Sequence, residues 1–344
     1  MWLIDTCSDA HVPGLTRRLL LAVLATLVPA VAASPAGAAG HANQAVRKAG
    51  PNVGIVDIYT TLGYEDGAAA AGTGMLISRS GEVLTNNHVI RGATKFKVVD
   101  VTTHRSYNAT VVGYSVSHDI AVLQLANASH LQTIRLGGYL KLHVGQQVIA
   151  RGNAQGRGGA PKAAPGQVIA LHRKIVARDI SDESETLHNV IATNTAVEPG
   201  DSGGPLEDVR NRAIGMVTAG STVGVARGFA IPIRQALLYA RTIMKGKSSA
   251  AIHVGPTAFL GVVLKDVSGG TQIQQVLPNL PADAAGLVAG DVITSLNGAP
   301  ISSMADMRQA LLSLAVGTAV SIGWNDTTGT AQTGTITPAS GPPQ

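Results

Sequence analysis

Cysteine is almost absent from this chain of 344 residues, since the single one is Cys7, close to the N-terminus. A mature chain without that segment has no thiol, which excludes disulfides, thiolate metal sites and a cysteine nucleophile. Aromatic residues make up only 3 % of the chain. No apolar run reaches the roughly 20 residues that span a bilayer. Glycine, by contrast, is abundant, with 40 residues.

Charge is also scarce, at 14 % of residues with a net charge of +5. Lysine and arginine occur singly or in pairs and do not cluster with aromatic residues, so we expect no binding of nucleic acid. The chain is 45 % hydrophobic, which is too apolar for disorder, and its glycines and prolines interrupt long helices. The composition predicts a globular, mainly β protein whose length allows two or three domains.

The N-terminus has the layout of a secretory signal peptide. Arg17 and Arg18 precede the apolar run of residues 19–31, and small residues follow. We expect a signal peptide over residues 1–38 and a protein that is secreted or held in the cell envelope, outside the cytoplasm. A retained membrane anchor is the weaker interpretation, because the apolar run is short.

Short apolar runs alternate with turn residues from about Pro51 onward, which predicts an all-β first unit. One amphipathic helix ends this unit, with apolar residues at helical spacing: Ile233, Leu237, Ala240 and Met244. We place the first unit at residues 39–247, a polar linker at 248–255, a second unit at 256–338 and a disordered tail at 339–344, which ends in the polar stretch "SGPPQ".

The second unit has signals for two helices and a hairpin. Pro281 suits the first turn of a short helix, and Gly286 suits its left-handed end. The dipeptide "NG" at 297–298 predicts a tight hairpin. Ser303 and Asp306 fit a capping box for a helix of about ten residues. The unit is therefore predicted to be a small α+β domain.

The stretch "AVEPGDSGGPL", residues 196–206, surrounds one hydroxyl with glycines. Gly200, Gly203 and Gly204 leave three positions around Ser202 without side chains, so a substrate carbonyl can approach and backbone N–H groups can face a developing negative charge. This arrangement is what acyl transfer requires.

A serine nucleophile needs a base and a group that orients the base. His88 in "LTNNHVI" and Asp119 in "SHDIAVLQL" supply both. Taken singly, His88 reads as a turn residue and Asp119 as a strand cap. In the order His, Asp, Ser, and with a glycine-framed serine, the catalytic interpretation is favoured.

Two other chemistries are disfavoured. "GDSGG" also matches the G-x-S-x-G elbow of α/β-hydrolases, but in that fold the histidine follows the serine. The only histidine after Ser202 is His253, in the linker. The remaining histidines show no H-E-x-x-H pairing, so we expect neither a metal nor a cofactor.

The motifs "TNNHVI", "HDIAVLQL", "PGDSGGP", "IGMVTAG" and "GFAIP" together resemble the HtrA (DegP-like) serine proteases, in that family's order. "FLGV" and "AGLVAGDVITSLNG" in the second unit resemble the family's PDZ domain. The likeness covers residues 51–338 and is strongest to short secreted actinobacterial members with one PDZ domain. It implies a chymotrypsin-like double β-barrel protease domain followed by a PDZ domain.

This resemblance implies roles for individual residues. Ser202 would be the nucleophile, His88 the general base and Asp119 the orienting carboxylate, and the N–H groups of Gly200 and Ser202 would form the oxyanion hole. The implied specificity pocket contains no acid, so small or medium aliphatic residues are expected before the cut. Its residues are Ala196, Thr218, Ala219 and Ile231.

The resemblance also implies a peptide site in the second unit. A PDZ domain binds the C-terminus of a polypeptide through successive backbone N–H groups while the peptide adds as a strand. The implied carboxylate loop is Leu260, Gly261 and Val262, and Met307 and Leu311 are expected to line the hydrophobic slot. The alternative is a small β-domain that only covers the protease.

The sequence departs from the family at Asp201, where the family usually has asparagine. A local arginine or lysine partner for Asp201 is favoured over pairing with a newly cut N-terminus. The segment "TLGYEDGAAAAGTG" is short where cage-forming members of the family carry a long loop. The resemblance therefore argues against assembly into large cages, while a monomer and a homotrimer both stay open. The predicted function is a serine endopeptidase acting on unfolded or exposed polypeptides. The alternative is a chaperone-like peptide-binding protein with a resting protease site.

Overall fold

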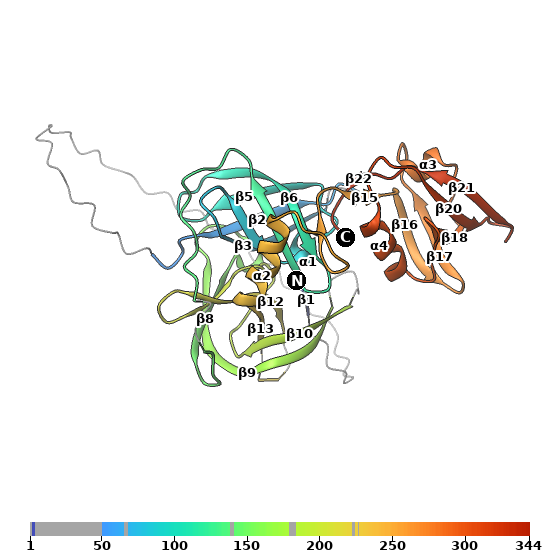
Figure 1. Ribbon diagram of the computed structural model, residues 1–344. Coiled ribbons are helices and arrows are strands. Elements are labelled where there is room, and N and C mark those ends of the chain that lie inside the picture. Colours follow the sequence, from blue (N-terminus) through green and yellow to red (C-terminus); the bar gives the residue numbers. More distant parts are fainter. Residues whose placement is uncertain are drawn as a thin grey trace, which may run out of the picture. The chain divides into compact units, whose positions relative to one another are not determined.

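The computed structural model describes residues 2–3, 50–64, 68–137, 141–178, 184–221, 224–225 and 227–344 (Figure 1). Apart from the two-residue strand β1 (Trp2–Leu3), the predicted signal peptide lies outside the described residues. Among the helices in these ranges, none combines the length and apolarity needed to cross a membrane.

The first half of the chain forms a closed antiparallel barrel. Its strands are β2 (Ile55–Thr61), β3 (Ala69–Leu76), β4 (Glu82–Thr85), β5 (Lys95–Asp100), β6 (Ser106–Ser115) and β7 (Ile120–Leu125). They pair in the order β6-β5-β2-β3-β4-β7, and β7 pairs again with β6, which closes the sheet. Apolar side chains such as Ile58, Leu76 and Leu123 fill the interior.

A second barrel follows. Its strands are β8 (Gln147–Gly152), β9 (Lys162–Arg178), β10 (Ser184–Thr193), β11 (Pro205–Asp208), β12 (Ala213–Gly220) and β13 (Gly228–Pro232), with the 3-10 turn η1 (Ala154–Gly156) after β8. They pair in the order β12-β11-β8-β9-β10-β13, and β13 returns to β12. Strand β1 adds to β12 in parallel at Ala219 and Gly220. The two closed sheets confirm the predicted double barrel.

Helix α2 (Ile233–Met244) packs its apolar face against β6, β7 and β12. Ile233 and Ile243 lie in one buried cluster with Ile55, Ile120 and Met216, so residues from both barrels share this core. The predicted helical face is shifted at its end, because Ile243 is buried while Met244 is 39 % exposed.

The predicted linker contains a short strand, β14 (His253–Val254), which pairs with β6 so that His253 faces Tyr114. Just beyond it, the hydroxyl of Thr257 lies 3.0 Å from the buried hydroxyl of Tyr114. The linker is therefore an added edge strand of the first barrel.

The second unit is a sheet with two helices. Its strands are β16 (Val262–Val267), β17 (Gly270–Val276), β18 (Val292–Leu296), β19 (Ala299–Pro300), β20 (Val320–Asn325) and β21 (Ala331–Ile336), and its helices are α3 (Pro281–Ala284) and α4 (Met304–Ser313). Strand β16 is at one end of the sheet order. Ser303 caps α4 by accepting the Asp306 N–H at 3.2 Å, as the capping motif predicts.

The tail differs from its predicted disorder. Residues Ala339–Gly341 form β22, which pairs antiparallel with β15 (Thr257–Phe259), and Pro342 and Pro343 are buried. A Cβ at Gly341 would lie 2.2 Å from the Cβ of Phe259, so glycine allows this close approach. Proline has no N–H that burial would leave unpaired, which lets a segment of disorder-like composition pack closely.

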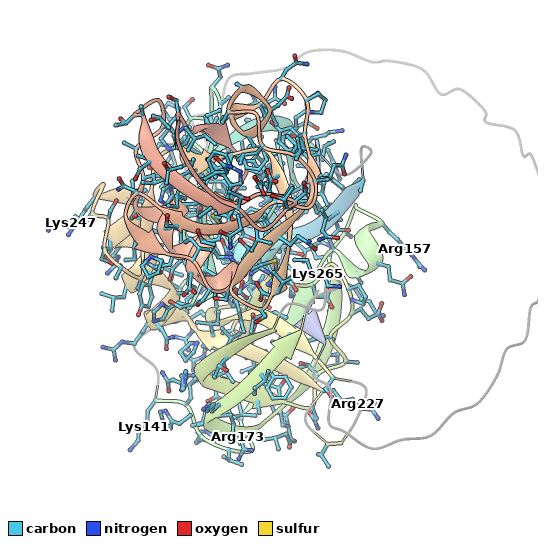
Figure 2. The ribbon with its side chains drawn as sticks, turned by 90° about the vertical axis from the view of Figure 1, so that its right-hand side faces the viewer. Lys141, Arg157, Arg173, Arg227, Lys247 and Lys265 are labelled. Carbon is cyan, nitrogen blue, oxygen red and sulfur yellow. The ribbon has the colours of Figure 1, made fainter. Side chains whose placement is uncertain are left out.

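Basic side chains are spread over many segments. Figure 2 labels six of them, which come from loops, β9, β16 and the segment after α2: Lys141, Arg157, Arg173, Arg227, Lys247 and Lys265. This distribution follows the scattered sequence pattern.

Candidate active site

The helix α1 (Asn87–Ile90) carries His88 and follows directly after β4 of the first barrel. It has only four residues, and the side chain of its N-cap residue, Asn86, forms no capping hydrogen bond. Asn87, Val89 and Ile90 are buried, so the turn is held by packing. Val89 fills the space beside Gly72, where an added Cβ would come within 2.6 Å of it.

Asp119 lies at the start of β7 and is completely buried. Its Oδ1 accepts the backbone N–H of His88 at 3.0 Å, and the His88 Nδ1 lies 3.0 Å from both carboxylate oxygens. The side-chain amide of Asn86 donates to the Asp119 carbonyl at 2.9 Å. Since an ionised carboxylate only accepts, Nδ1 carries the proton and Nε2 is the basic nitrogen.

Burial lowers the pKa of the His88 imidazole below its ordinary value, while Asp119 opposes that shift. The ring is therefore neutral at pH 7 and able to take a proton. The structure thus brings the predicted base and its orienting acid into direct contact.

Thr218 on β12 connects the two barrels at this point. Its hydroxyl makes a short hydrogen bond to Asp119 Oδ2, and its carbonyl accepts from the Ser202 hydroxyl at 3.4 Å. The family resemblance implied only a place for Thr218 in a specificity pocket, and the sequence gave no sign of these contacts. Because Thr218 is fully buried, solvent does not compete for its hydrogen bond to Asp119.

Ser202 lies in the loop before β11, and its carbonyl accepts the N–H of Thr73 on β3 at 2.8 Å. Gly200 and Gly203 flank it with φ values of 94° and 85°. A Cβ at Gly200 would lie 2.1 Å from the Asn153 carbonyl oxygen, and one at Gly203 would lie 2.0 Å from that of Thr73. The glycines are therefore required for both backbone conformation and space.

The N–H groups of Gly200 and Ser202 have no hydrogen-bond acceptor within the part of the chain that the structure describes. Neighbouring N–H groups in the same loop are used, since Asp201, Gly203 and Gly204 donate to backbone carbonyls. Two unused donors beside a serine hydroxyl have the form of an oxyanion hole.

The sequence relatives decide the family. Residues 72–216 match the trypsin-like peptidase domain, and residues 258–325 match the PDZ domain. The chain is 35 % identical over 281 residues to the periplasmic serine endoprotease DegP of Salmonella typhimurium, covering 76 % of this chain and 55 % of that protein. The chain belongs to the HtrA family of DegP-like serine proteases.

Another relative is the periplasmic pH-dependent serine endoprotease DegQ of Escherichia coli, with 36 % identity over 264 residues, 73 % of this chain and 56 % of DegQ. This HtrA-family chain spans about half the length of these curated relatives. A crystal structure of the serine endoprotease from Yersinia pestis aligns with 86 % of this chain and 97 % of its own, at 25 % identity and a TM-score of 0.48.

Asp201, the departure from the HtrA pattern, is 3 % exposed. Its Oδ2 accepts the Glu198 N–H at 2.8 Å, while its Oδ1 is buried without a hydrogen-bond partner among the described residues. Lys162, whose charge acts to lower the pKa of Asp201, forms an ion pair with Glu198 instead. Burial raises the pKa of Asp201 to about 6. The partner is thus a backbone N–H and not the expected arginine or lysine.

This burial makes stability depend on pH. The folded-state pKa of Asp201, about 6, lies above the ordinary 3.8, so the charged form destabilises the fold above pH 6 and this cost vanishes below pH 4. We expect Asp201→Asn to raise the free energy of unfolding by about 1–2 kcal/mol at pH 7.5, and by almost nothing at pH 4. Urea denaturation at both pH values measures the difference. An equal effect at both values would contradict this assignment.

The residues implied for the specificity pocket are placed in different surroundings. Ala219 is buried on β12, whereas Ala196 is exposed in the loop before Ser202. Ile231 pairs with Met216 and packs in the core shared by the barrels, so its side chain is in the interior.

Val197, which the sequence analysis did not single out, lies beside the end of β12. Gly220 pairs with Gly228, and a Cβ at Gly228 would lie 2.8 Å from Cγ2 of Val197. Val197 therefore packs over two glycines where larger side chains would leave no room. No sequence signal identified it, because it has no polar chemistry.

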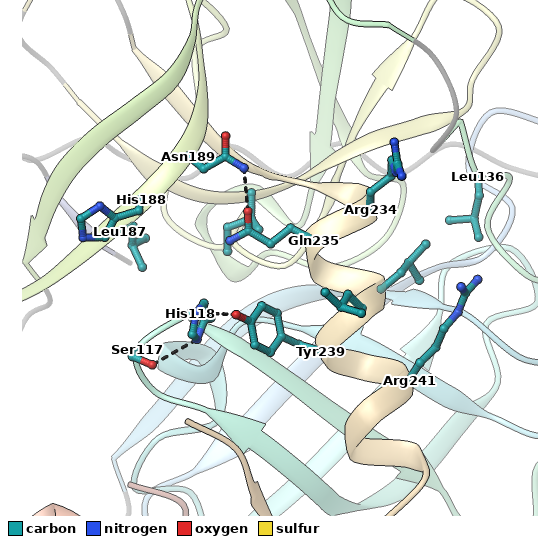
Figure 3. A pocket seen from close by; sticks show the side chains of 13 residues that line it. Ser117, His118, Leu136, Leu187, His188, Asn189, Arg234, Gln235, Tyr239 and Arg241 are labelled. Atoms are coloured by element: carbon teal, nitrogen blue, oxygen red, sulfur yellow. Dashed lines mark hydrogen bonds between the residues drawn. The ribbon is translucent and has the colours of Figure 1, made fainter. Parts of the chain in front are cut away.

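A pocket of about 730 Å³ lies beside α2 (Figure 3). Tyr239 on α2 and His118 line it, with the tyrosine hydroxyl 2.6 Å from His118 Nε2. Ser115 and Ser117 hold the other ring nitrogen at 3.0 and 3.1 Å. These bonds fix the turn that delivers Asp119 to the site, and Asp119 itself has a φ of 51°.

In the PDZ domain, Leu260, Met307 and Leu311 lie together in the buried core. Gly261 has a φ of 80°, and a Cβ there would lie 2.4 Å from Leu280. The N–H groups of Leu260 and Gly261 have no acceptor within the described part of the chain, and Val262 begins the edge strand β16. Free donors beside a sheet edge suit a peptide carboxylate.

Among all the residues that the structure describes, no group of three or more His, Cys, Asp or Glu side chains could hold a metal ion.

Proposed function

We propose that this protein is a serine endopeptidase that cleaves unfolded or exposed polypeptides through an acyl-enzyme. The observation that carries the proposal is the continuous set of contacts from His88 to Asp119 to Thr218 to Ser202, next to two unused N–H donors. Family membership and the trypsin-like domain support it.

The mechanism follows from these positions. His88 Nε2 takes the proton of the Ser202 hydroxyl as its oxygen attacks the scissile carbonyl, and Asp119 stabilises the imidazolium that forms. The N–H groups of Gly200 and Ser202 bind the oxyanion. The imidazolium then protonates the leaving amine, and water, activated by the same ring, releases the acyl group.

The substrate is expected to carry a small or medium aliphatic residue before the cut. Val197 packs over Gly228, and the implied pocket has no acidic residue that would bind lysine or arginine. The edge of β12 at Ala219 and Gly220 can accept a strand, since β1 pairs with it there. An extended polypeptide can bind at the same edge by strand addition.

The same proposal places the protein outside the cytoplasm. The sequence relatives are named periplasmic, and the N-terminal pattern is that of an exported protein. The PDZ domain would bind peptide C-termini at Leu260, Gly261 and Val262, with the peptide added along β16 and its last side chain directed toward Met307 and Leu311.

Digestion of casein by residues 39–344 tests the proposal, with every cut mapped by mass spectrometry. We expect cuts after Ala, Val and similar residues, and none with the Ser202→Ala variant as the matched control. A preference for lysine or arginine would refute the pocket. If Ser202→Ala loses no function and both proteins suppress aggregation equally, the chaperone-like alternative is correct.

A further inference from the structure

The segment after β22 ends against the helix that carries the general base. The side-chain amide of Asn87 donates to the Gln344 carbonyl at 3.0 Å, and the Gly92 N–H donates to the Pro343 carbonyl at 2.9 Å. The Gln344 N–H donates to the buried Tyr114 hydroxyl at 3.2 Å. Three hydrogen bonds therefore connect residues 343–344 to Asn87 and Gly92, which precede and follow His88 in the sequence, and to Tyr114 on β6.

These contacts lie where α1 needs support. A helix of four residues is not stable alone, and the side chain of its N-cap residue, Asn86, forms no capping hydrogen bond. Its other anchors are the Asn86 and His88 bonds to Asp119, and an ion pair of 2.6 Å from Arg91 to Glu185 on the second barrel. Residues 343–344 add acceptors for Asn87 and Gly92, which belong to the helix and the turn after it.

Strand pairing and two prolines also restrict the conformations of this segment. Strand β22 pairs with β15, so that Gly341 faces Thr257, and the Thr257 hydroxyl contacts the same Tyr114 hydroxyl. Pro342 and Pro343 are buried and restrict the conformations of the unbound segment, which reduces the entropy lost on binding.

We propose that residues 342–344, the anchor segment, are a positioning element for catalysis: bound to Asn87, Gly92 and Tyr114, they hold α1 so that His88 faces Ser202. The anchor segment touches no reacting atom. It acts through the backbone of α1, and its release moves the imidazole away from the serine. This proposal rests on the proposed protease function.

Deleting residues 342–344 is the test, with Gln344→Ala as the control because it keeps both backbone contacts of that residue. We expect the deletion to lower kcat about tenfold with KM changed less than twofold, since a small misplacement of a catalytic group reduces turnover without weakening binding. Gln344→Ala is expected to keep full kcat. A deletion variant with full kcat, or one whose loss is entirely in KM, would overturn the proposal.

A double-mutant cycle separates positioning from general destabilisation. Asn87→Ala removes one anchor contact from the helix side and is expected to lower kcat severalfold in the full-length protein. In the protein lacking 342–344 it should add less than twofold. Additive losses would mean that Asn87 and the segment act independently, which would overturn the proposal.

Two measurements decide the matter even if the full-length protein cleaves nothing and the protease proposal fails. In the Ser202→Ala background, hydrogen exchange at the Gly92 amide and in α1 is expected to be faster after the deletion. The pKa of His88, followed by NMR, is expected to rise as burial lessens. Unchanged exchange and an unchanged pKa would show that the segment does not position the helix.

Discussion

Asp119→Asn is expected to lower the kcat for peptide cleavage by about 10⁴-fold, the typical loss when the acid of such a triad becomes an amide. Oδ1 accepts the His88 N–H and Oδ2 accepts the Thr218 hydroxyl, so both carboxylate oxygens are used as acceptors. An amide has one acceptor oxygen and one NH₂ donor. The NH₂ group would face either the Thr218 hydroxyl or Nδ1 of His88, and in the second case it selects the tautomer whose Nε2 cannot accept a proton.

The matched control is Asp100→Asn. Asp100 is also buried, and its Oδ1 accepts the N–H groups of Thr102 and Thr103 at 2.8 and 3.2 Å. An asparagine oxygen can accept both, so kcat should stay within about twofold of the parent protein. Comparing kcat, KM and circular dichroism of both variants separates catalysis from folding. Near-normal turnover by Asp119→Asn would remove Asp119 from the mechanism.

Gly200→Ala is expected to reduce kcat by about 10²–10³-fold while leaving the triad in place. The φ of Gly200 is 94°, and the new Cβ would lie 2.1 Å from the carbonyl oxygen of Asn153. Since neither the conformation nor the space admits a side chain, the peptide must rotate or shift, and its N–H leaves the oxyanion site.

Gly145→Ala is the control for Gly200→Ala. Gly145 has a similar φ of 84°, but no atom lies within 4 Å of an added Cβ. This variant carries the conformational cost alone, so it should lose some stability and keep its kcat. Steady-state kinetics and thermal unfolding of the two variants give the comparison. Equal kcat values for both would exclude an oxyanion role for Gly200.

The triad could be predicted because each member has a local motif. Ser202 is marked by glycines, which are needed where the backbone has a positive φ or packs closely against other atoms, and such glycines are visible in the local sequence. The motifs around His88 and Asp119 are short and occur in a fixed order along the chain. The all-β character of the first unit was predicted for a related reason, since alternating apolar runs separated by turns extend across it. Its division into two barrels was implied only by the family resemblance. Local patterns of this kind are visible in sequence.

Contacts between distant residues had no such signal. Thr218 reaches Asp119 across 99 positions of the sequence, and nothing in "MVTAG" distinguishes a hydroxyl that faces an acid from one that lines a pocket. The partner of Asp201 was mistaken for a cation because a backbone N–H is present at nearly every residue and marks no position in sequence. Ile231 was assigned to a pocket, although its register with Met216 directs it to the core.

The segment 339–344 was mispredicted for a compositional reason. Serine, glycine, proline and glutamine are typical of disordered proteins, because they offer little apolar area to bury. Here the segment gains its order from β15 and from polar groups on the first barrel. Composition alone therefore does not reveal that a short terminal segment pairs with a strand from much earlier in the chain.

The strand β14 and its neighbours bear on how such proteins recombine. A gene fusion made at residue 247, where the sequence marks the end of the protease unit, would separate β6 from β14 and Tyr114 from Thr257. A transplanted PDZ domain would have to supply an equivalent edge strand for the recipient barrel. In an engineered chimera, the unit to exchange is therefore the barrel with its own linker and not the protease domain alone.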